Sequence, residues 1–411
     1  MRRLNTITSI LPILFTLVVA AGCKSVIDRQ DVRPRVLRDV PARNLAYRLT
    51  PDVASPADLN QEQINDPGQN VANHFAAKRQ DDALVRTIAS PDGKRVLALY
   101  GTENEPASAF RIDLYSSDGQ FLRNLIPPDL SCLFPETVAW SPDGRFINFI
   151  ARKKLSPSPT PTPPNQPEPE PIPSPFGSPV PSPSIAPLFP PVASFLTEQI
   201  YISNRDGYDL KPLTSREGLI YFYFAWSPDS HALVALACKE DEWNERERQY
   251  KMPAGRPRLI TPDGTERLLD DGLTEALPVW CPDASKIATA FDTDIAIYDA
   301  GGSTPTQGRV PLGEQLIAAS VIYEERSGTK KADANANAKP GAADKSGSPA
   351  PASSATPAVP PSFNPIVGLH WPTPETLYFK TAYVRVLPSE TINTFQRWHQ
   401  LNLSAQAAVL K

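Results

Sequence analysis

A short pattern of apolar and polar residues recurs along the chain. At residues 137–150 an apolar run ends in a tryptophan, a Ser-Pro-Asp-Gly turn follows, and an alternating apolar strand comes next. Proline presets φ at the first central position of a turn, aspartate bonds to its own backbone, and glycine accepts the left-handed conformation. The pattern therefore predicts a β-hairpin with a buried aromatic residue at the end of its first strand.

The same hairpin occurs five times, the last time in a degenerate form. The five copies occupy residues 88–100, 137–150, 224–236, 278–291 and 369–379. In four copies a second hairpin follows, with its turn at an Asp-Gly or Gly-Gly pair: residues 110–125, 200–214, 258–269 and 295–302. Two hairpins make the four strands of one propeller blade. We expect an all-β fold, a β-propeller of four-stranded blades with five recognisable repeats and five or six blades in total.

Three copies keep a tryptophan and an aspartate at fixed places around the turn. These residues are Trp140, Asp143, Trp226, Asp229, Trp280 and Asp283. Because the repeat gives them the same surroundings each time, we interpret the tryptophans as anchors of the blade core and the aspartates as turn formers. They are therefore not expected to form a ligand platform or a carboxylate cluster.

The repeats resemble those of the TolB-type β-propellers, whose blades read Trp-Ser-Pro-Asp-Gly and then Ile-Tyr, with a later Asp-Gly and Leu-Thr. Residues 200–214 are most similar to this pattern, and the resemblance covers roughly residues 83–411. It implies the fold and leaves the function open, since one fold hosts many roles. TolB proteins also carry an N-terminal α/β domain, for which residues 24–82 are too short and too polar. The resemblance therefore does not extend to the specific partners of TolB.

The start of the chain has the pattern of a bacterial lipoprotein signal peptide. Arg2 and Arg3 precede an apolar stretch, which ends in Ala-Ala-Gly and Cys23. By resemblance to a lipobox, we expect a signal peptide at residues 1–22 and a lipid on Cys23, which would place the protein in the bacterial cell envelope, at the outer membrane facing the periplasm in a host with two membranes. The alternative is an uncleaved membrane anchor, for which the apolar run is short.

Residues 23–82 are expected to be a lipidated N-terminus and tether ahead of a propeller at 83–411. Within them, Leu45, Tyr47 and Leu49 alternate with smaller or charged residues, which puts the three side chains on one face of a strand. This short run is either part of a surface tether or an edge strand that closes the propeller.

Two insertions interrupt the repeats. Proline occupies 16 of the 36 positions of residues 156–191, and residues 326–362 are rich in Ala, Lys, Asp, Ser, Gly and Pro. Such compositions favour extended or disordered chain. Without the insertions the spacing from turn to turn stays at about 50 residues, so we expect two disordered loops within one continuous array.

Composition and motifs exclude several functions. A net charge of −4 provides no basic surface for nucleic acid. The four histidines lack metal-ligand spacing, and nucleophile-elbow, P-loop and dinucleotide motifs are absent from the sequence. We expect no catalytic residue, no metal and no cofactor, and hence a protein that is not an enzyme.

Two glutamates are candidate contacts for a ligand in the central channel. Glu136 and Glu275 precede their tryptophans by four and five residues, near the start of the innermost strands. An inward acidic pair would bind a cation or a basic peptide tail; the alternative is that both are solvated loop residues. Among Cys132, Cys238 and Cys281 at most one disulfide can form, and the spacing does not select it.

The sequence favours a membrane-anchored envelope lipoprotein whose propeller is a protein-binding or scaffold module for other envelope proteins. The alternative is a propeller enzyme of the lyase or lactonase type with a site in the central channel.

Overall fold

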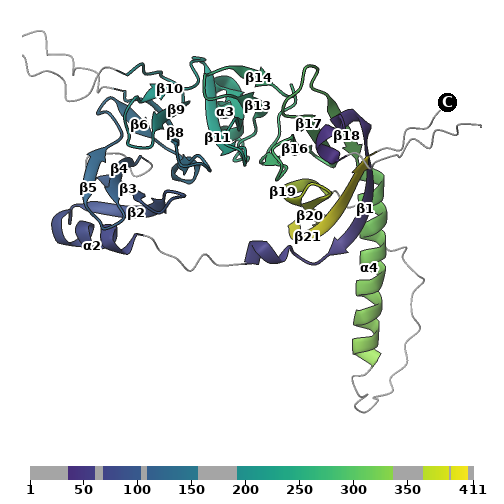
Figure 1. The fold of residues 1–411 in the computed structure, drawn as a ribbon. Helices are drawn as coiled ribbons and strands as arrows, with labels where there is room; N and C mark the ends of the chain where they lie inside the picture. The colour runs from purple at the N-terminus through teal and green to yellow at the C-terminus, as the bar shows by residue number, and fades with distance from the viewer. Residues whose placement is uncertain are drawn as a thin grey trace, which may run out of the picture. The chain divides into compact units, whose positions relative to one another are not determined.

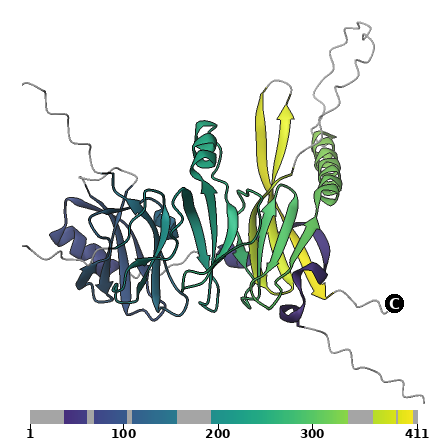
Figure 2. The ribbon, with the colours of Figure 1, turned by 90° about the horizontal axis from the view of Figure 1, so that it is seen from above.

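A computed structural model describes residues 36–60, 68–102, 109–155, 192–336, 364–387 and 390–405. The chain divides into two units, Met1–Val36 and Leu37–Lys411. The described residues of the second unit form five antiparallel sheets, four of four strands and one of five (Figures 1 and 2). The predicted all-β fold of propeller blades is therefore confirmed.

The first four blades consist of strands that follow one another in the sequence. Blade 1 contains β2 (Asp82–Ala89), β3 (Arg95–Thr102), β4 (Arg111–Ser116) and β5 (Phe121–Asn124). Blade 2 contains β6 (Leu130–Cys132), β7 (Ala139–Trp140), β8 (Phe146–Lys153), β9 (Gln199–Asn204) and β10 (Lys211–Pro212). Blade 3 contains β11 (Leu219–Trp226), β12 (Leu233–Lys239), β13 (Arg256–Ile260) and β14 (Glu266–Leu268). Blade 4 contains β15 (Val279–Trp280), β16 (Lys286–Phe291), β17 (Asp294–Asp299) and β18 (Gln307–Pro311).

Blade 5 contains strands from both the N-terminal and the C-terminal part of the described chain. Its strands β19 (Ile366–Thr373), β20 (Thr376–Leu387) and β21 (Glu390–Ala405) are completed by β1 (Leu45–Val53), which pairs antiparallel with β21. Leu45, Tyr47 and Leu49 lie on β1 and pack against the apolar cluster between blades 4 and 5. The alternating residues of the N-terminal region thus belong to the outermost strand of the last blade.

Helices lie between or beside the blades. They are η1 (Leu37–Asp39), η2 (Ala42–Asn44), η3 (Ala57–Asn60), α2 (Gln69–Lys78), η4 (Pro135–Thr137), α3 (Glu240–Arg248) and α4 (Gly313–Ala336). Val71 and Phe75 of α2 pack on the face of blade 1 that is turned away from blade 2. Residues 156–191 lie outside the described residues, whereas α4 continues to Ala336, so residues 326–336 are helical where the sequence analysis expects the start of a disordered insertion.

The repeated turn has the same internal hydrogen bond in three blades. The serine hydroxyl donates to the aspartate carboxylate over 2.7 Å in blade 1 and 2.6 Å in blades 2 and 3. The glycine position has positive φ in all four turns, including Ser230 (62°) and Ala284 (59°). Ser230 offsets its strained backbone with a further bond, because its hydroxyl accepts the backbone N–H of Asp143 at 3.0 Å and so joins the turns of blades 2 and 3.

The tryptophans before the turns are buried, and two of them connect neighbouring blades. Trp140 Nε1 donates to the Ile88 carbonyl of blade 1 at 3.2 Å, and Trp280 Nε1 donates to the Ala225 carbonyl of blade 3 at 3.0 Å. Each acceptor lies two residues before the turn serine of the preceding blade. Trp226 differs: its ring stacks on Phe146 of blade 2 at an interplanar angle of 10°, and its Nε1 has no hydrogen-bond partner among the described residues.

This difference predicts unequal effects of two identical substitutions. Trp140→Phe and Trp226→Phe each retain an aromatic ring, but only the first removes a hydrogen bond between blades. We expect Trp140→Phe to lower the free energy of unfolding by about 1 kcal/mol more than Trp226→Phe, the typical worth of one such bond. Urea unfolding of both variants measures the difference, and equal losses would show that the indole hydrogen bond adds nothing.

A buried histidine holds the N-terminal strand on blade 5. His399 is 1% exposed, and its Nδ1 accepts the backbone N–H of Asp52 on β1 at 3.3 Å, while Nε2 lies 3.0 Å from the Thr381 hydroxyl. Burial, together with the charge of Arg397, lowers the pKa of His399 to about 4. The imidazole is therefore neutral in the folded protein, as its acceptor role at Nδ1 requires.

The lowered pKa predicts a loss of stability in mild acid. In the unfolded chain His399 takes up a proton near pH 6.5, whereas the folded protein resists protonation down to about pH 4. Stability therefore falls as the pH drops through this window, by about 2 kcal/mol between pH 7 and 5. His399→Asn retains an acceptor for Asp52 without a titrating group, so its stability should depend less on pH than that of the wild type. His231→Asn, at an exposed histidine, is the control and should retain the wild-type dependence; a wild-type dependence in His399→Asn would contradict the account.

Candidate functional site

The two predicted channel glutamates lie in blades 2 and 4, and their role in a channel stays a prediction. Glu136 is exposed on η4, and Glu275 is exposed and forms an ion pair with Arg246 of α3. The aspartates of the repeats remain within their turns. Cys238 and Cys281 are buried free thiols, and Cys132 is also buried.

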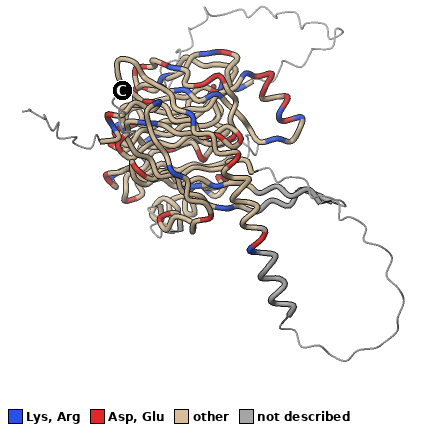
Figure 3. The backbone as a smooth tube through the Cα atoms, turned by 90° about the vertical axis from the view of Figure 1, so that its right-hand side faces the viewer, with Lys and Arg blue, Asp and Glu red and all other residues tan. Residues whose placement is uncertain are grey.

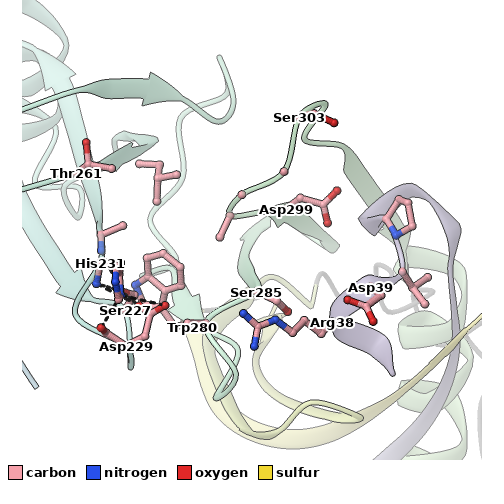
Figure 4. A pocket seen from close by; sticks show the side chains of 18 of the residues that line it. Arg38, Asp39, Ser227, Asp229, His231, Thr261, Trp280, Ser285, Asp299 and Ser303 are labelled. Atoms are coloured by element: carbon pink, nitrogen blue, oxygen red, sulfur yellow. Dashed lines mark hydrogen bonds and ion pairs between the residues drawn. The ribbon is translucent and has the colours of Figure 1, made fainter. Parts of the chain in front are cut away.

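A pocket of about 590 Å³ lies at the turn end of blades 3 and 4 (Figure 4). Five parts of the chain form it: the N-terminal segment at η1, the β11–β12 turn, the end of β13, the end of β15 with the turn after it, and the end of β17 with the loop after it. Its polar lining residues are Arg38, Asp39, Ser227, Asp229, His231, Thr261, Ser285, Asp299, Ser303 and Thr304, and the indole of Trp280 adds an apolar wall.

A buried ion pair places the N-terminal segment at this pocket. Asp299 Oδ1 accepts the backbone N–H of Ala42 at 3.0 Å and lies 3.5 Å from Lys286 Nζ, while Oδ2 accepts both the N–H and the hydroxyl of Thr306. Lys286 Nζ also donates to the carbonyl of Arg38 at 3.3 Å. Since both charges are satisfied, Asp299 and Lys286 position η1, and they leave the Arg38 side chain to line the pocket (Figure 4).

Ser227, Asp229 and His231 have residue types of a hydrolase triad but not its geometry. Ser227 is buried; its hydroxyl donates to Asp229 and accepts the backbone N–H groups of His231 and Ala232. Partial burial by itself would raise the pKa of Asp229. The hydrogen bonds that its carboxylate accepts from the Ser227 hydroxyl and from the backbone N–H of His231 outweigh burial and hold this pKa below its usual range. The serine and the aspartate therefore form the turn, and the serine is not a nucleophile.

The imidazole of His231 is the group in this turn that is able to react with a ligand. Its side chain is 80% exposed, and its Nδ1 lies 2.8 Å from the carbonyl oxygen of Asp229. A carbonyl oxygen only accepts, so Nδ1 carries a proton, and Asp229 Oδ2 lies 3.5 Å from the same nitrogen. In the neutral tautomer with this proton, Nε2 presents a lone pair. Arg38, His231 and Asp299 were missed by the sequence analysis. One signal was present: His231 replaces the basic residue that follows the turn in blades 1 and 2, Lys94 and Arg145.

No group of three or more His, Cys, Asp or Glu side chains that suits a metal ion is found among the described residues. None of the described helices is long and apolar enough to span a membrane.

Comparison with known proteins identifies similar solved structures only. No family model and no curated protein matches the chain. A structure of oligogalacturonate lyase in complex with manganese has 12% identity and a TM-score of 0.31, over 54% of this chain and 52% of that one. Prolyl oligopeptidase B from Galerina marginata, bound to a 25mer macrocyclization substrate, has 11% identity and a TM-score of 0.40 over 92% of this chain and 43% of that one. A nidogen/laminin complex has 11% identity and a TM-score of 0.28, over 76% of this chain and 81% of that one.

These matches correct one expectation. The prediction that the chain is not an enzyme is contradicted, because oligogalacturonate lyase and prolyl oligopeptidase, both enzymes, are among the similar solved structures. The chain spans about half the length of the lyase. At these identities and TM-scores the matches assign no reaction, substrate or partner to this chain.

Proposed function

We propose that the pocket of blades 3 and 4 binds a small ligand, or the end of a larger one, that carries a carboxylate and several hydroxyl groups. The observation that carries the proposal is the convergence of Arg38 and His231 on one pocket of about 590 Å³, within the range of ligand sites. A guanidinium binds a carboxylate through two parallel hydrogen bonds. The hydroxyls of Ser303 and Thr304 suit polar groups of the ligand, and Trp280 offers a flat apolar wall for a ring.

Arg38 predicts selectivity for acids over their neutral counterparts. We expect glucuronate and galacturonate to raise the melting temperature of the protein, whereas glucose and galactose, which lack the carboxylate, should leave it unchanged. Arg38→Gln should abolish the effect of the acids. Arg43→Gln, at an exposed arginine outside the pocket, is the matched control and should retain it. The site would be refuted if acids and neutral sugars raised the melting temperature equally, or if the acids raised it equally in Arg38→Gln and Arg43→Gln.

A second candidate function is catalysis in the same pocket, and His231 favours it. With its Nδ1 proton directed at a carbonyl oxygen, the imidazole in its neutral form is oriented to accept a proton at Nε2. Next to a carboxylate held by Arg38, it is suited to removing the proton from the adjacent carbon, the first step of an elimination of the lyase type. With oligomeric uronates as substrate, His231→Asn should then abolish turnover and leave the acid-induced rise in melting temperature intact; absence of turnover in the wild type leaves the binding function alone.

We further propose that a lipid on Cys23 tethers the propeller to a membrane of the bacterial envelope. The proposal is supported by the basic start, the short apolar stretch and the small residues before Cys23. These residues lie outside those that the structure describes. Two or more acyl chains at one residue anchor a protein stably, whereas one chain does so only marginally.

The tether predicts a change of compartment on a single substitution. Cys23→Ser should abolish incorporation of a radiolabelled fatty acid and move the protein from the membrane fraction to the soluble fraction. The control is Cys132→Ser, which should leave the lipid label and the membrane fraction unchanged because the Cys132 side chain is buried in blade 2. Retention of the lipid label by the Cys23→Ser protein would exclude the tether.

A further inference from the structure

Arg38 and Asp39 give the pocket of blades 3 and 4 a positive and a negative group on adjacent residues. Both side chains belong to η1, are exposed and line the pocket (Figure 4). The hydrogen bond from Lys286 ends on the backbone carbonyl of Arg38 and does not involve the guanidinium. In the part of the chain that the structure describes, neither side chain forms a hydrogen bond or an ion pair. Both charges are therefore open to a ligand.

The other two carboxylates that line the pocket are engaged within the protein. Asp229 accepts hydrogen bonds inside its own turn. Asp299 accepts hydrogen bonds from the backbone of η2 and from Thr306, and it pairs with Lys286. An ionised carboxylate accepts hydrogen bonds and donates none. Asp39 is therefore the lining carboxylate that a donor group of the ligand meets without competition from the described part of the protein.

Acidic side chains outnumber basic ones around the pocket. Besides His231, the charged side chains that line it, or that a hydrogen bond or ion pair joins to a lining residue in the described structure, comprise three basic and five acidic residues: Arg38, Arg267 and Lys286, and Asp39, Asp229, Asp263, Asp283 and Asp299. The two charges of η1 cancel, and so do those of the buried Asp299–Lys286 pair. The remainder is acidic.

This charge balance determines how the pocket attracts a ligand. In the view of Figure 3, basic and acidic residues are interspersed along the described backbone. A cleft lined by charges of one sign attracts ligands of the opposite sign, and the acidic excess gives this pocket no such field for an anion. A carboxylate of the ligand is therefore held by the Arg38 guanidinium against an acidic background. A positive group of the ligand beside Asp39 offsets that repulsion.

An ammonium group satisfies Asp39 better than a hydroxyl group does. Both groups donate hydrogen bonds, but the ammonium group also carries the positive charge that the acidic surroundings lack. The Cα atoms of consecutive residues are about 3.8 Å apart, so the two η1 side chains suit groups on neighbouring atoms of one ligand. An α-amino acid carries a carboxylate and an ammonium group in this arrangement.

We infer that the ligand of the pocket is a zwitterion, a hydroxylated amino acid of the amino-sugar acid class. Its carboxylate pairs with Arg38 and its ammonium group with Asp39, while its hydroxyl groups face Ser303 and Thr304. Asp39 is thus the specificity-determining residue of the site. The inference rests on the proposed function, since it requires an acid at Arg38, and it adds the charged group that selects among acids.

The experiment is calorimetric titration of the full chain with gluconate and with glucosaminate, which differ only in a hydroxyl or an ammonium group at carbon 2. We expect glucosaminate to bind about fivefold more tightly, the upper range for one exposed ion pair, and this preference to decrease with added salt. Asp39→Asn should bind both compounds equally. Asp81→Asn, at an exposed aspartate ahead of blade 1 and outside the pocket, is the matched control and should keep the preference.

Equal binding of the two compounds by the wild type would overturn the inference, and so would a preference that survives in Asp39→Asn. The proposed function would still stand in both cases if gluconate bound the wild type and Arg38→Gln abolished its binding. Glucosamine, which has the ammonium group without a carboxylate, should bind more weakly than glucosaminate; equal binding would exclude a zwitterion held at Arg38. If gluconate, glucosaminate and the uronates all failed to bind, the proposed function and the inference would both be wrong. An unchanged melting temperature without ligand checks that Asp39→Asn folds.

Discussion

The hydrogen bond from a buried indole to the backbone of the preceding blade is the interaction on which the turn end of the propeller depends. Trp140 and Trp280 each reach the same carbonyl position, two residues before the turn of the neighbouring blade. An indole N–H in a core requires an acceptor, and the bond fixes how far one blade is offset from the next. Between blades 2 and 3, where Trp226 has no such bond in the described structure, the hydroxyl of Ser230 joins the two turns directly.

The N-terminal segment contributes to both the fold of the propeller and its pocket. It supplies β1 to blade 5, and η1 forms one wall of the pocket. Several polar contacts hold it, among them one from the neutral His399 to the backbone of Asp52 and one from the buried Asp299 to the backbone of Ala42. A tether at Cys23 would therefore be joined to the propeller through the same segment that contributes Arg38 to the site.

Local pattern predicted the blades, because each hairpin depends on residues within about ten positions of its turn. The serine, proline and aspartate of the turn and the tryptophan before it sufficed for the four-stranded repeat.

The site was not predictable in this way. Arg38 and His231 are far apart in the sequence, and contacts distant in sequence, among them the buried Asp299–Lys286 pair, bring their segments to one pocket. Glu136 and Glu275 appeared equivalent in their repeats, but the insertion of α3 provided Arg246 as a partner for one of them. The exclusion of an enzyme rested on missing motifs, and a site assembled from five separate segments contains no motif.

The central claim is that residues 37–53 are integral to the propeller, since both blade 5 and the pocket require them. Amide hydrogen exchange of the full chain tests this most directly. The amides of β1 that pair with β21, from Leu45 to Thr50, should be protected to within about tenfold of those in β20, and the amide of Ala42 should be protected through its bond to Asp299. Exchange of these amides at the rate of an unstructured chain, with β20 and β21 still protected, would contradict the account and remove the wall that Arg38 gives the pocket.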